Sequence, residues 1–392
     1  MVDERRGVCG IKYPPGVALL QLPFVSPWAD PKLREGFSRE AHAIVLALGS
    51  GLLLLIATLS YLTLRRLDVC PLQAQAVVGA FIFGTGLFHY ATYDASFSHV
   101  YSAGGVALLL WLVTRARETG WRPWMLGLFG LSTFWLSTVR QTNVLLTLLI
   151  AGVAIIGTDH RSARRVALIA VGTTALALLL QVAYNQYVTG TLTLFSYGRE
   201  GFASWGGRFG DVWFSYERGL STYYPIMIAA MVLGLFSGER LLGLAFAIGV
   251  TGYAFLYGSW HSWMLGHGMG HRGFVELAPL AMVVFGSALQ RLQPRWRLVA
   301  IGVTGLSVYV TLQVMVGYWR GSFPFTGANS DVYWRHLLRP SGSQLVVAFS
   351  ALIATILWAR LGTDGYRADE HQDARSLDGS GEMTQRPSGV GP

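Results

Sequence analysis

The most reactive side chains of this sequence stand in short polar segments between long apolar stretches. The first segment, residues 93–99, contains Asp94 and His99. A carboxylate can accept the proton of an attacking hydroxyl, and an imidazole can bind a phosphate or a sugar hydroxyl. The alternative is that Asp94 only caps the helix that follows it. We treat Asp94 as a candidate general base and His99 as a candidate substrate-binding residue.

A second polar segment, residues 140–143, begins with Arg140 and ends with Asn143. The planar guanidinium group of arginine matches the oxygens of a phosphate. The alternative is an arginine at a membrane boundary that extends its charged end toward water and binds no ligand. Because few arginines stand in connectors of this kind, we take Arg140 as a candidate phosphate-binding residue and Asn143 as a candidate substrate-binding residue.

A third segment, residues 259–276, combines glycines with tryptophans, histidines and single charges. Such a loop suits the wrapping of a polar ligand. Arg272 stands at a predicted helix start, where backbone N–H groups and the helix dipole favour an anion, so it is a second candidate for phosphate binding. The alternative is that Arg272 pairs with Glu276, four residues later. The candidate substrate-binding residues of this segment are Trp260, His261, His267, His271 and Glu276.

The three histidines of this segment could also hold a zinc ion, but their spacing matches no strong zinc pattern. Its glycines follow no predicted strand, as a dinucleotide-binding loop requires. We therefore assign no metal ligand and no cofactor, and we leave a need for a divalent metal open. A fourth segment, residues 197–218, mixes aromatic and charged residues that suit sugar stacking, although each charge alone is more typical of a solvated loop. Tyr197 is its candidate substrate-binding residue.

Membrane-spanning helices are the elements that must position these segments. The chain has 392 residues, of which 52% are hydrophobic and only 13% are charged, whereas a soluble chain carries about a quarter charged residues. We expect an all-α fold, a polytopic bundle of about eleven transmembrane helices whose outer-face loops form a cavity. The predicted spans cover residues 43–64, 74–93, 100–114, 124–139, 144–157, 166–188, 223–236, 241–257, 274–289, 298–318 and 344–358.

The connectors between these spans alternate strictly between two chemical types. One type is short and rich in arginine, as the positive-inside rule expects at the cytoplasmic face. The other type holds the four polar segments and a fifth connector, residues 319–340, so we expect the active side to lie on the outer face. The formal net charge of +9 comes from arginines at membrane boundaries, and we therefore expect anionic lipid and no nucleic acid as its partner.

The two ends of the chain differ from the middle. Residues 1–40 are interrupted by prolines and carry an apolar run too short to cross a membrane, so we expect a segment lying at the outer interface. Residues 41–360 form the predicted transmembrane domain. Residues 361–392 are polar without apolar periodicity, which indicates a disordered tail on the cytoplasmic side.

The order of several short motifs resembles a known family. The matching pieces are Lys12-Tyr13-Pro14-Pro15-Gly16, Leu19-Leu20, Pro23-Phe24, Ser98-His99 with Tyr101, Arg140 with Asn143, Asn185, Gly190, Tyr197-Gly198, Gly219-Leu220, Tyr224-Pro225, residues 263–270, Arg272 and Pro279. In this order they resemble bacterial integral-membrane glycosyltransferases of the C superfamily, in the branch of protein mannosyltransferases and aminoarabinose transferases. The resemblance covers about residues 10–320.

The resemblance implies transfer of a sugar, with inversion, from a polyprenyl-phosphate carrier to a lipid, glycan or protein acceptor. It implies a site on the outer face of the bacterial inner membrane. Lys12 matches a family lysine that faces the carrier phosphate, and Arg140 and Arg272 are the other phosphate candidates. The family also places an acidic base soon after its first transmembrane helix. That helix is not seen here, which predicts a missing start, and Asp3 or Asp94 would then take the role.

Two other classes of function fit parts of the sequence. A flippase or other transporter of lipid carriers would favour broken helices with polar residues at mid-membrane, whereas most charges here stand at helix ends. A non-catalytic membrane or assembly protein, such as a degenerate transferase, would explain the missing acidic loop.

Overall fold

Helices form almost the whole described structure. The computed structural model of the chain describes residues 2–3, 8–9, 13–28, 38–195, 200–324 and 326–378, and of residues 2–3, 8–9 and 361–378 it describes the backbone alone. The strands β1 (Val2–Asp3) and β2 (Val8–Cys9) form one short antiparallel pair. The all-α class predicted from the sequence is confirmed.

The helices cover every predicted apolar stretch, although their bounds differ from the predicted ones. In chain order they are α1 (Gly16–Val25), η1 (Ser26–Trp28), α2 (Arg39–Arg66), α3 (Pro71–Gly84), α4 (Leu87–Thr92), α5 (Ser98–Thr119), α6 (Pro123–Val139), α7 (Asn143–Ile155), α8 (His160–Thr189), α9 (Phe209–Phe214), α10 (Leu220–Tyr223), α11 (Pro225–Gly234), α12 (Arg240–Ser259), η2 (Arg272–Leu277), α13 (Ala278–Arg291), α14 (Pro294–Trp319), α15 (Ser330–Leu338) and α16 (Gly342–Asp378).

Several of these helices have the length and composition of membrane spans, which makes the chain a multi-pass membrane protein. Within the described residues, the six helical segments that meet both criteria are Arg39–Arg66, His160–Thr189, Arg240–Ser259, Arg272–Arg291, Pro294–Trp319 and Gly342–Arg360. Helix α5 has 22 residues but does not meet the composition criterion. The apolar helices Gly16–Trp28, Pro71–Gly84, Asn143–Ile155 and Pro225–Gly234 are shorter than the hydrocarbon thickness requires. A count of eleven crossings therefore stays a prediction.

The predicted span 74–93 is divided into α3 and α4, and the division orients polar residues. Thr85 is extended, with a ψ angle of 179°, so α3 ends there. The hydroxyl oxygen of Thr85 accepts a hydrogen bond from the backbone N–H of Leu87, the first residue of α4, at 3.2 Å. Helix α4, which carries His89 and Tyr90, is therefore not a continuation of α3.

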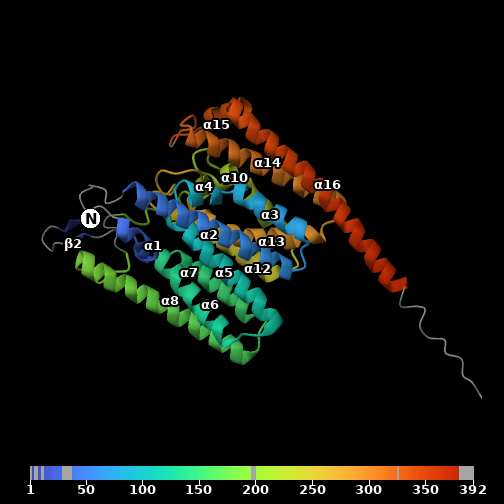
Figure 1. Cartoon of the computed structure of the whole chain (residues 1–392). Helices are drawn as coiled ribbons and strands as arrows, with labels where there is room; N and C mark the ends of the chain where they lie inside the picture. The colour runs from blue at the N-terminus through green and yellow to red at the C-terminus, as the bar shows by residue number, and fades with distance from the viewer. Residues whose placement is uncertain are drawn as a thin grey trace, which may run out of the picture.

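The bundle is densest around the segment formed by η2 and α13. Every residue from Ala278 to Leu289 is buried, and α13 packs against α2, α3, α5, α11 and α12. The flanking helices α8 and α16 lie on opposite edges (Figure 1) and expose most of their apolar side chains. Exposed leucine and isoleucine side chains on these flanks suit contact with lipid tails.

The arginine-rich connectors meet at one end of the bundle. Arg66 at the end of α2 forms an ion pair with Glu118 at the end of α5. Arg117 of α5 pairs with Glu239, which precedes α12. The polar segments listed above lie at the other ends of the same helices, so the alternation of connectors corresponds to two separate ends of the bundle.

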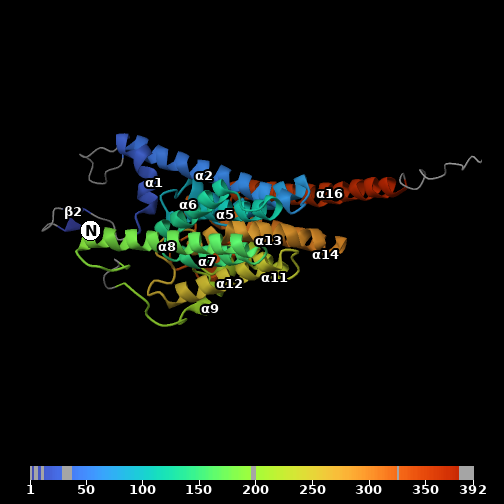
Figure 2. The same ribbon diagram turned by 90° about the horizontal axis from the view of Figure 1, so that it is seen from below.

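The two ends of the chain carry further helices. Helix α1 packs against α2 and α6, and Figure 2 shows it at a steep angle to α2. Helix α16 continues beyond residue 361, where we expected a disordered tail, and ends at Asp378. The alanines, arginines and glutamate of this stretch favour helix even though the stretch is polar. Residues 379–392 lie outside the described residues.

Candidate functional site

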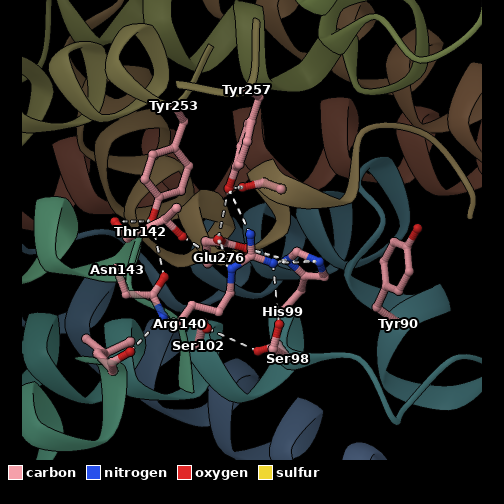
Figure 3. Close-up of polar contacts among 12 residues, drawn as sticks. Tyr90, Ser98, His99, Ser102, Arg140, Thr142, Asn143, Tyr253, Tyr257 and Glu276 are labelled. Carbon is pink, nitrogen blue, oxygen red and sulfur yellow. Dashed lines mark hydrogen bonds and ion pairs between the residues drawn. The ribbon is translucent and has the colours of Figure 1, made fainter. Parts of the chain in front are cut away.

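Three ionisable side chains from different elements form a buried ion cluster, which we define as His99, Arg140 and Glu276. His99 lies in the first turn of α5, Arg140 follows the last residue of α6, and Glu276 lies in η2. The Nδ1 atom of His99 is 2.8 Å from Oε2 of Glu276, and Nε of Arg140 is 3.8 Å from Oε1 of the same carboxylate. Figure 3 shows the guanidinium group of Arg140 next to both other side chains.

The hydrogen bonds of this cluster fix the proton of His99. A carboxylate only accepts, so Nδ1 of His99 carries the hydrogen that is donated to Glu276. The Nε2 atom is then an acceptor, and one terminal guanidinium nitrogen of Arg140 lies 3.1 Å from Nε2 and 3.3 Å from Nδ1. Arg140 therefore lies against the imidazole near both nitrogens, and the bond to Glu276 is the contact that assigns the proton to Nδ1.

Polar residues of two further helices support the cluster. The hydroxyl of Tyr257, on α12, donates to the Gly273 carbonyl at 3.2 Å and lies 3.5 Å from Arg140 and from Glu276. The amide of Asn143, at the start of α7, donates to the Ser102 hydroxyl at 2.8 Å and accepts from the Tyr253 hydroxyl at 3.1 Å. The sequence prediction of His99, Arg140, Asn143 and Glu276 therefore selected residues that the structure brings together (Figure 3).

The ligand roles predicted for these residues stay predictions. Glu276 and His99 have 0% and 1% of their side chains exposed, and that of Arg140 is 18% exposed. The negative charge of Glu276 lies beside Arg140, so the cluster balances its own charges. Removing one member of a buried pair is costly because the other remains buried and charged. The cluster joins α5, α6 and η2, and its structural role is to hold the ends of these elements together.

Residues 265–271 form a loop that lies against tyrosine and arginine side chains, and we call it the glycine loop. Leu265, Gly266, Gly268 and Gly270 all have positive φ. The Met269 carbonyl accepts hydrogen bonds from the Tyr90 hydroxyl at 3.0 Å and from the Tyr224 hydroxyl at 2.8 Å. The close approach of Tyr90 also requires glycine at position 268, where a Cβ would stand 2.7 Å from its oxygen.

Arg272 follows the glycine loop and differs from Arg140 in its partners. Its guanidinium group donates to the carbonyl of His267 at 3.0 Å and to that of Leu265, and it lies over the Phe97 ring at 4.2 Å. Among the described residues, no carboxylate is within ion-pair distance of Arg272. Its charge is therefore satisfied by neutral groups only. An anion is a partner that such a guanidinium group can still take.

The alternative pairing of Arg272 with Glu276 does not occur in the described structure. These residues lie in η2, a 3₁₀ segment. A 3₁₀ segment has three residues per turn, so side chains four apart point about 120° away from each other and do not face one another as in an α-helix. Glu276 is instead directed at Arg140 and His99.

Asp94 lies beside a histidine and a tryptophan that the sequence analysis missed. Its Oδ2 atom is 3.0 Å from Nε2 of His89 on α4, and Nδ1 of His89 accepts from the indole N–H of Trp319 at 2.8 Å. Asp94 is 26% exposed, whereas His89 is fully buried. An ionisable residue inside an apolar stretch was the signal for His89.

Asp94 and two arginines converge on one pair of tyrosines. The hydroxyl groups of Tyr90 and Tyr318 each lie within electrostatic range of Asp94, Arg218 and Arg272. Arg218 also donates to the Gly270 carbonyl at 3.3 Å. A carboxylate and two guanidinium groups thus border the same region at the end of the bundle. We call Asp94, Arg218 and Arg272 the convergent group.

The other predicted residues of the third segment serve different purposes. Trp260 packs edge-on against Phe202, and the His261 backbone N–H donates to the Gly201 carbonyl at 3.0 Å. The side chains of His261 and His267 are exposed. Trp260 and His261 therefore border the loop before α9, whereas His267 belongs to the glycine loop through its carbonyl, and none of the three joins the buried ion cluster.

His271 is buried at the end of the glycine loop. Its Nε2 donates to the Trp263 carbonyl at 3.1 Å, and its Nδ1 has no hydrogen-bond partner among the described residues. Burial lowers the pKa of His271 to about 3, so the imidazole is neutral. In the part of the chain that the structure describes, no group of three histidine, cysteine or acidic side chains is placed to hold a metal ion. The need for a divalent metal remains open.

Three predicted site residues cannot be placed by their side chains. Lys12 and Tyr197 lie outside the described residues, and only the backbone of Asp3 is described, in β1. The segment that follows Lys12 is close to Arg140, because a Cβ on Gly16 would stand 2.6 Å from the Thr138 carbonyl oxygen. Tyr13 lies within electrostatic range of Arg272.

Comparison of the chain with models of protein families, with curated proteins and with solved structures gives no match. The resemblance to membrane glycosyltransferases therefore stays a prediction.

Proposed function

We propose that this protein is a membrane glycosyltransferase that moves a sugar from a polyprenyl-phosphate carrier to an acceptor hydroxyl. The observation that carries the proposal is the convergent group: a Cβ on Gly268 would stand 2.7 Å from the Tyr90 oxygen and 3.8 Å from a nitrogen of both Arg218 and Arg272, and the partly exposed carboxylate of Asp94 lies within electrostatic range of the same tyrosine. Transfer from a lipid phosphate needs a proton acceptor on one side of the sugar and positive charge on the other. The order of motifs in the sequence supports the same class of reaction.

Each member of the convergent group has a role in this proposal. The acceptor hydroxyl attacks the anomeric carbon and inverts its configuration while Asp94 takes the hydroxyl proton. The bond between that carbon and the phosphate oxygen breaks, and the electron pair leaves with the polyprenyl phosphate. Arg272 and Arg218 stabilise the charge that develops on this phosphate. Because phosphate is a good leaving group, no strong general acid is needed.

The proposed site differs from the sequence prediction in the place of Arg140. Glu276 lies beside Arg140 at 3.8 Å and balances its charge, whereas Arg272 is held by carbonyls and an aromatic ring. We therefore assign the main phosphate contact to Arg272, and we assign Arg140 to the positioning of η2 and α5. Lys12 keeps its proposed role beside the phosphate, because Tyr13 next to it lies near Arg272.

The proposed orientation follows from the two ends of the bundle. The arginine-rich connectors around Arg66 and Arg117 suit the cytoplasmic face, and the convergent group would then lie on the outer face of the bacterial inner membrane. The C-terminal tail would be cytoplasmic. This orientation brings the site to the face where polyprenyl-phosphate sugars are proposed to be used.

The test is sugar transfer in membranes that contain the protein and polyprenyl-phosphate sugars made from radiolabelled nucleotide sugars. Asp94→Asn keeps the shape of the side chain and should lower transfer by about 100- to 10,000-fold, because a general base contributes that much. The control is Arg335→Ala, which removes an exposed residue of an ion pair with Asp331 and should leave transfer unchanged. Absence of transfer by the unaltered protein across the donor pool would favour a lipid-carrier transporter or an assembly protein.

A further inference from the structure

A chain of two hydrogen bonds leads from Trp319 through His89 to Asp94. The indole Nε1 of Trp319, the last residue of α14, is 2.8 Å from Nδ1 of His89. Nε2 of His89 is 3.0 Å from Oδ2 of Asp94. The three residues are far apart in the sequence, since 230 positions separate Trp319 from His89. Their contact is therefore a product of the fold and not of local geometry.

The direction of these bonds determines which nitrogen of His89 carries the proton. An indole N–H can only donate, so Nδ1 of His89 must present a lone pair to it. The single proton of the imidazole is then on Nε2, where it is donated to the carboxylate of Asp94. The imidazole is neutral in this arrangement, because a second proton on Nδ1 would face the indole N–H.

Aromatic packing holds the imidazole in the plane that these bonds need. The His89 ring lies nearly parallel to the rings of Tyr93 and Trp319, at centroid distances of 5.3 Å and 6.2 Å. Tyr93 and Trp319 are themselves 5.7 Å apart and nearly parallel, so they do not enclose the imidazole from opposite faces. The rings of Tyr90 and Tyr318 stand nearly perpendicular to the imidazole, at centroid distances of 4.7 Å and 5.2 Å. Because His89 also has no exposed side-chain surface, its ring has little room to turn.

Asp94 is fixed at one oxygen and is open at the other. Its Oδ2 accepts from His89, and among the described residues no donor is within hydrogen-bond distance of Oδ1. The side chain is 26% exposed. His89 therefore sets the orientation of the carboxylate, and Oδ1 is the oxygen left for an incoming hydroxyl.

We propose that His89 is a positioning residue that holds Asp94 in the orientation required of a proton acceptor, and that Trp319 fixes the imidazole tautomer that does so. The inference rests on the proposed transferase function. In the reaction, the proton of the acceptor hydroxyl passes to Oδ1 of Asp94 while Oδ2 keeps its bond to His89. The imidazole gives up no proton, and His89 does not contact the substrate.

Two substitutions at position 89 separate this role from a packing role. The amide nitrogen of His89→Gln occupies the place of Nε2 and can still donate to Asp94. The amide of His89→Asn occupies the place of Nδ1, so it can meet Trp319 but cannot reach Asp94. Both variants are neutral amides that lose the same ring, and they therefore disturb the aromatic packing to a similar extent.

The measurement is the steady-state rate of sugar transfer by the full chain in membranes fed with radiolabelled nucleotide sugars, together with thermal stability in detergent. We expect His89→Asn to lower kcat by about 10- to 100-fold with little change in KM, and His89→Gln to keep kcat within about threefold of the unaltered protein. Trp319→Phe, which keeps the aromatic ring and removes the donor, should give an intermediate kcat. Equal losses in the two His89 variants, or no loss in either, would overturn the inference.

The experiment also separates this inference from the proposed function. If Asp94→Asn abolishes transfer while His89→Asn does not, Asp94 is the base and its positioning by His89 is wrong. If Asp94→Asn is as active as the unaltered protein, the assignment of the base is wrong, and the inference fails with it. If the unaltered protein transfers no sugar, the proposed function itself has failed.

Discussion

The buried ion cluster and the convergent group lie at the same end of the bundle, but they satisfy their charges differently. In the buried ion cluster, the carboxylate of Glu276 faces both Arg140 and His99 and is wholly enclosed. In the convergent group, within the part of the chain that the structure describes, Asp94 has one oxygen without a donor and Arg272 has neutral partners only. Groups that already neutralise one another hold structure together, whereas groups with unused donors and acceptors can still bind a ligand.

This difference also separates two uses of arginine in one fold. Arg140 joins the end of α6 to η2 through the carboxylate of Glu276. Arg272 shapes the glycine loop through the carbonyls of Leu265 and His267, and its charge has no carboxylate partner among the described residues. We therefore assign Arg140 to positioning and Arg272 to anion binding, because their partners differ and not because of their places in the sequence.

The largest effect on stability is expected from Glu276→Gln. The amide oxygen of glutamine can still accept one hydrogen bond, but the negative charge is lost, and Arg140 would keep an uncompensated charge that is mostly buried. We expect the free energy of unfolding to fall by about 3 kcal/mol, near the lower end of the range for broken buried pairs. Thermal unfolding in detergent would measure it.

A matched control is Asp211→Asn, which breaks the exposed ion pair of Asp211 with Arg208. Exposed pairs contribute about 0–1 kcal/mol, so this variant should unfold close to the temperature of the unaltered protein. Equal destabilisation by Glu276→Gln and Asp211→Asn would contradict a structural role for the buried ion cluster.

A smaller effect on stability and a large one on transfer are expected from Arg272→Ala. Loss of a guanidinium group that stabilises the leaving phosphate should lower kcat/KM by about 100-fold, the effect of removing one donor that stabilises developing charge. Arg272→Lys should recover part of this loss, since lysine keeps the charge but not the planar donors. Initial rates at varied donor concentration would measure kcat/KM for both variants. Full activity of Arg272→Ala would show that Arg272 does not bind the phosphate.

A still smaller effect concerns the pH dependence of stability at His271. Burial lowers the pKa of His271 to about 3 in the folded protein, and the ordinary value for an unfolded chain is 6.5. Below that value the unfolded state binds a proton that the folded state does not, so stability is lost as the pH falls from 6.5 toward 3. The loss is at most about 1.4 kcal/mol per pH unit.

His271→Asn removes this titration, and the difference in unfolding temperature between pH 7.5 and pH 5.5 should be smaller for the variant than for the unaltered protein. An unchanged difference would show that other groups control the acid sensitivity. The buried ion cluster has a neutral His99 as well, so the same scan on His99→Asn would show whether the two regions respond separately.

The sequence predicted the membrane helices and the polar residues at their ends, because both follow from local composition. Helix length and arginine placement depend on residues within one segment. From α2 to α16, the structure has a helix at each predicted apolar stretch. His99, Arg140 and Glu276 could be selected as candidate site residues in the same way, since ionisable residues are rare at the ends of apolar helices.

The partners of these residues were not predictable from local spacing. Glu276 is 177 positions from His99, and its expected local partner Arg272 points elsewhere because η2 is a 3₁₀ segment. His89 escaped attention because it stands inside an apolar stretch, where only the break between α3 and α4 turns it toward Asp94. Which side chains pair across the bundle depends on how the helices pack, and the local patterns of a single sequence do not predict that packing.

The most direct test of the account compares Asp94→Asn with Glu276→Gln in the same two assays. The first assay is thermal stability in detergent, and the second is sugar transfer per folded molecule at a temperature where both variants are folded. We predict that Asp94→Asn keeps its stability and loses transfer, and that Glu276→Gln loses stability and keeps transfer within about threefold. Loss of transfer by Glu276→Gln with normal stability, or normal transfer by Asp94→Asn, would contradict the division between the two regions.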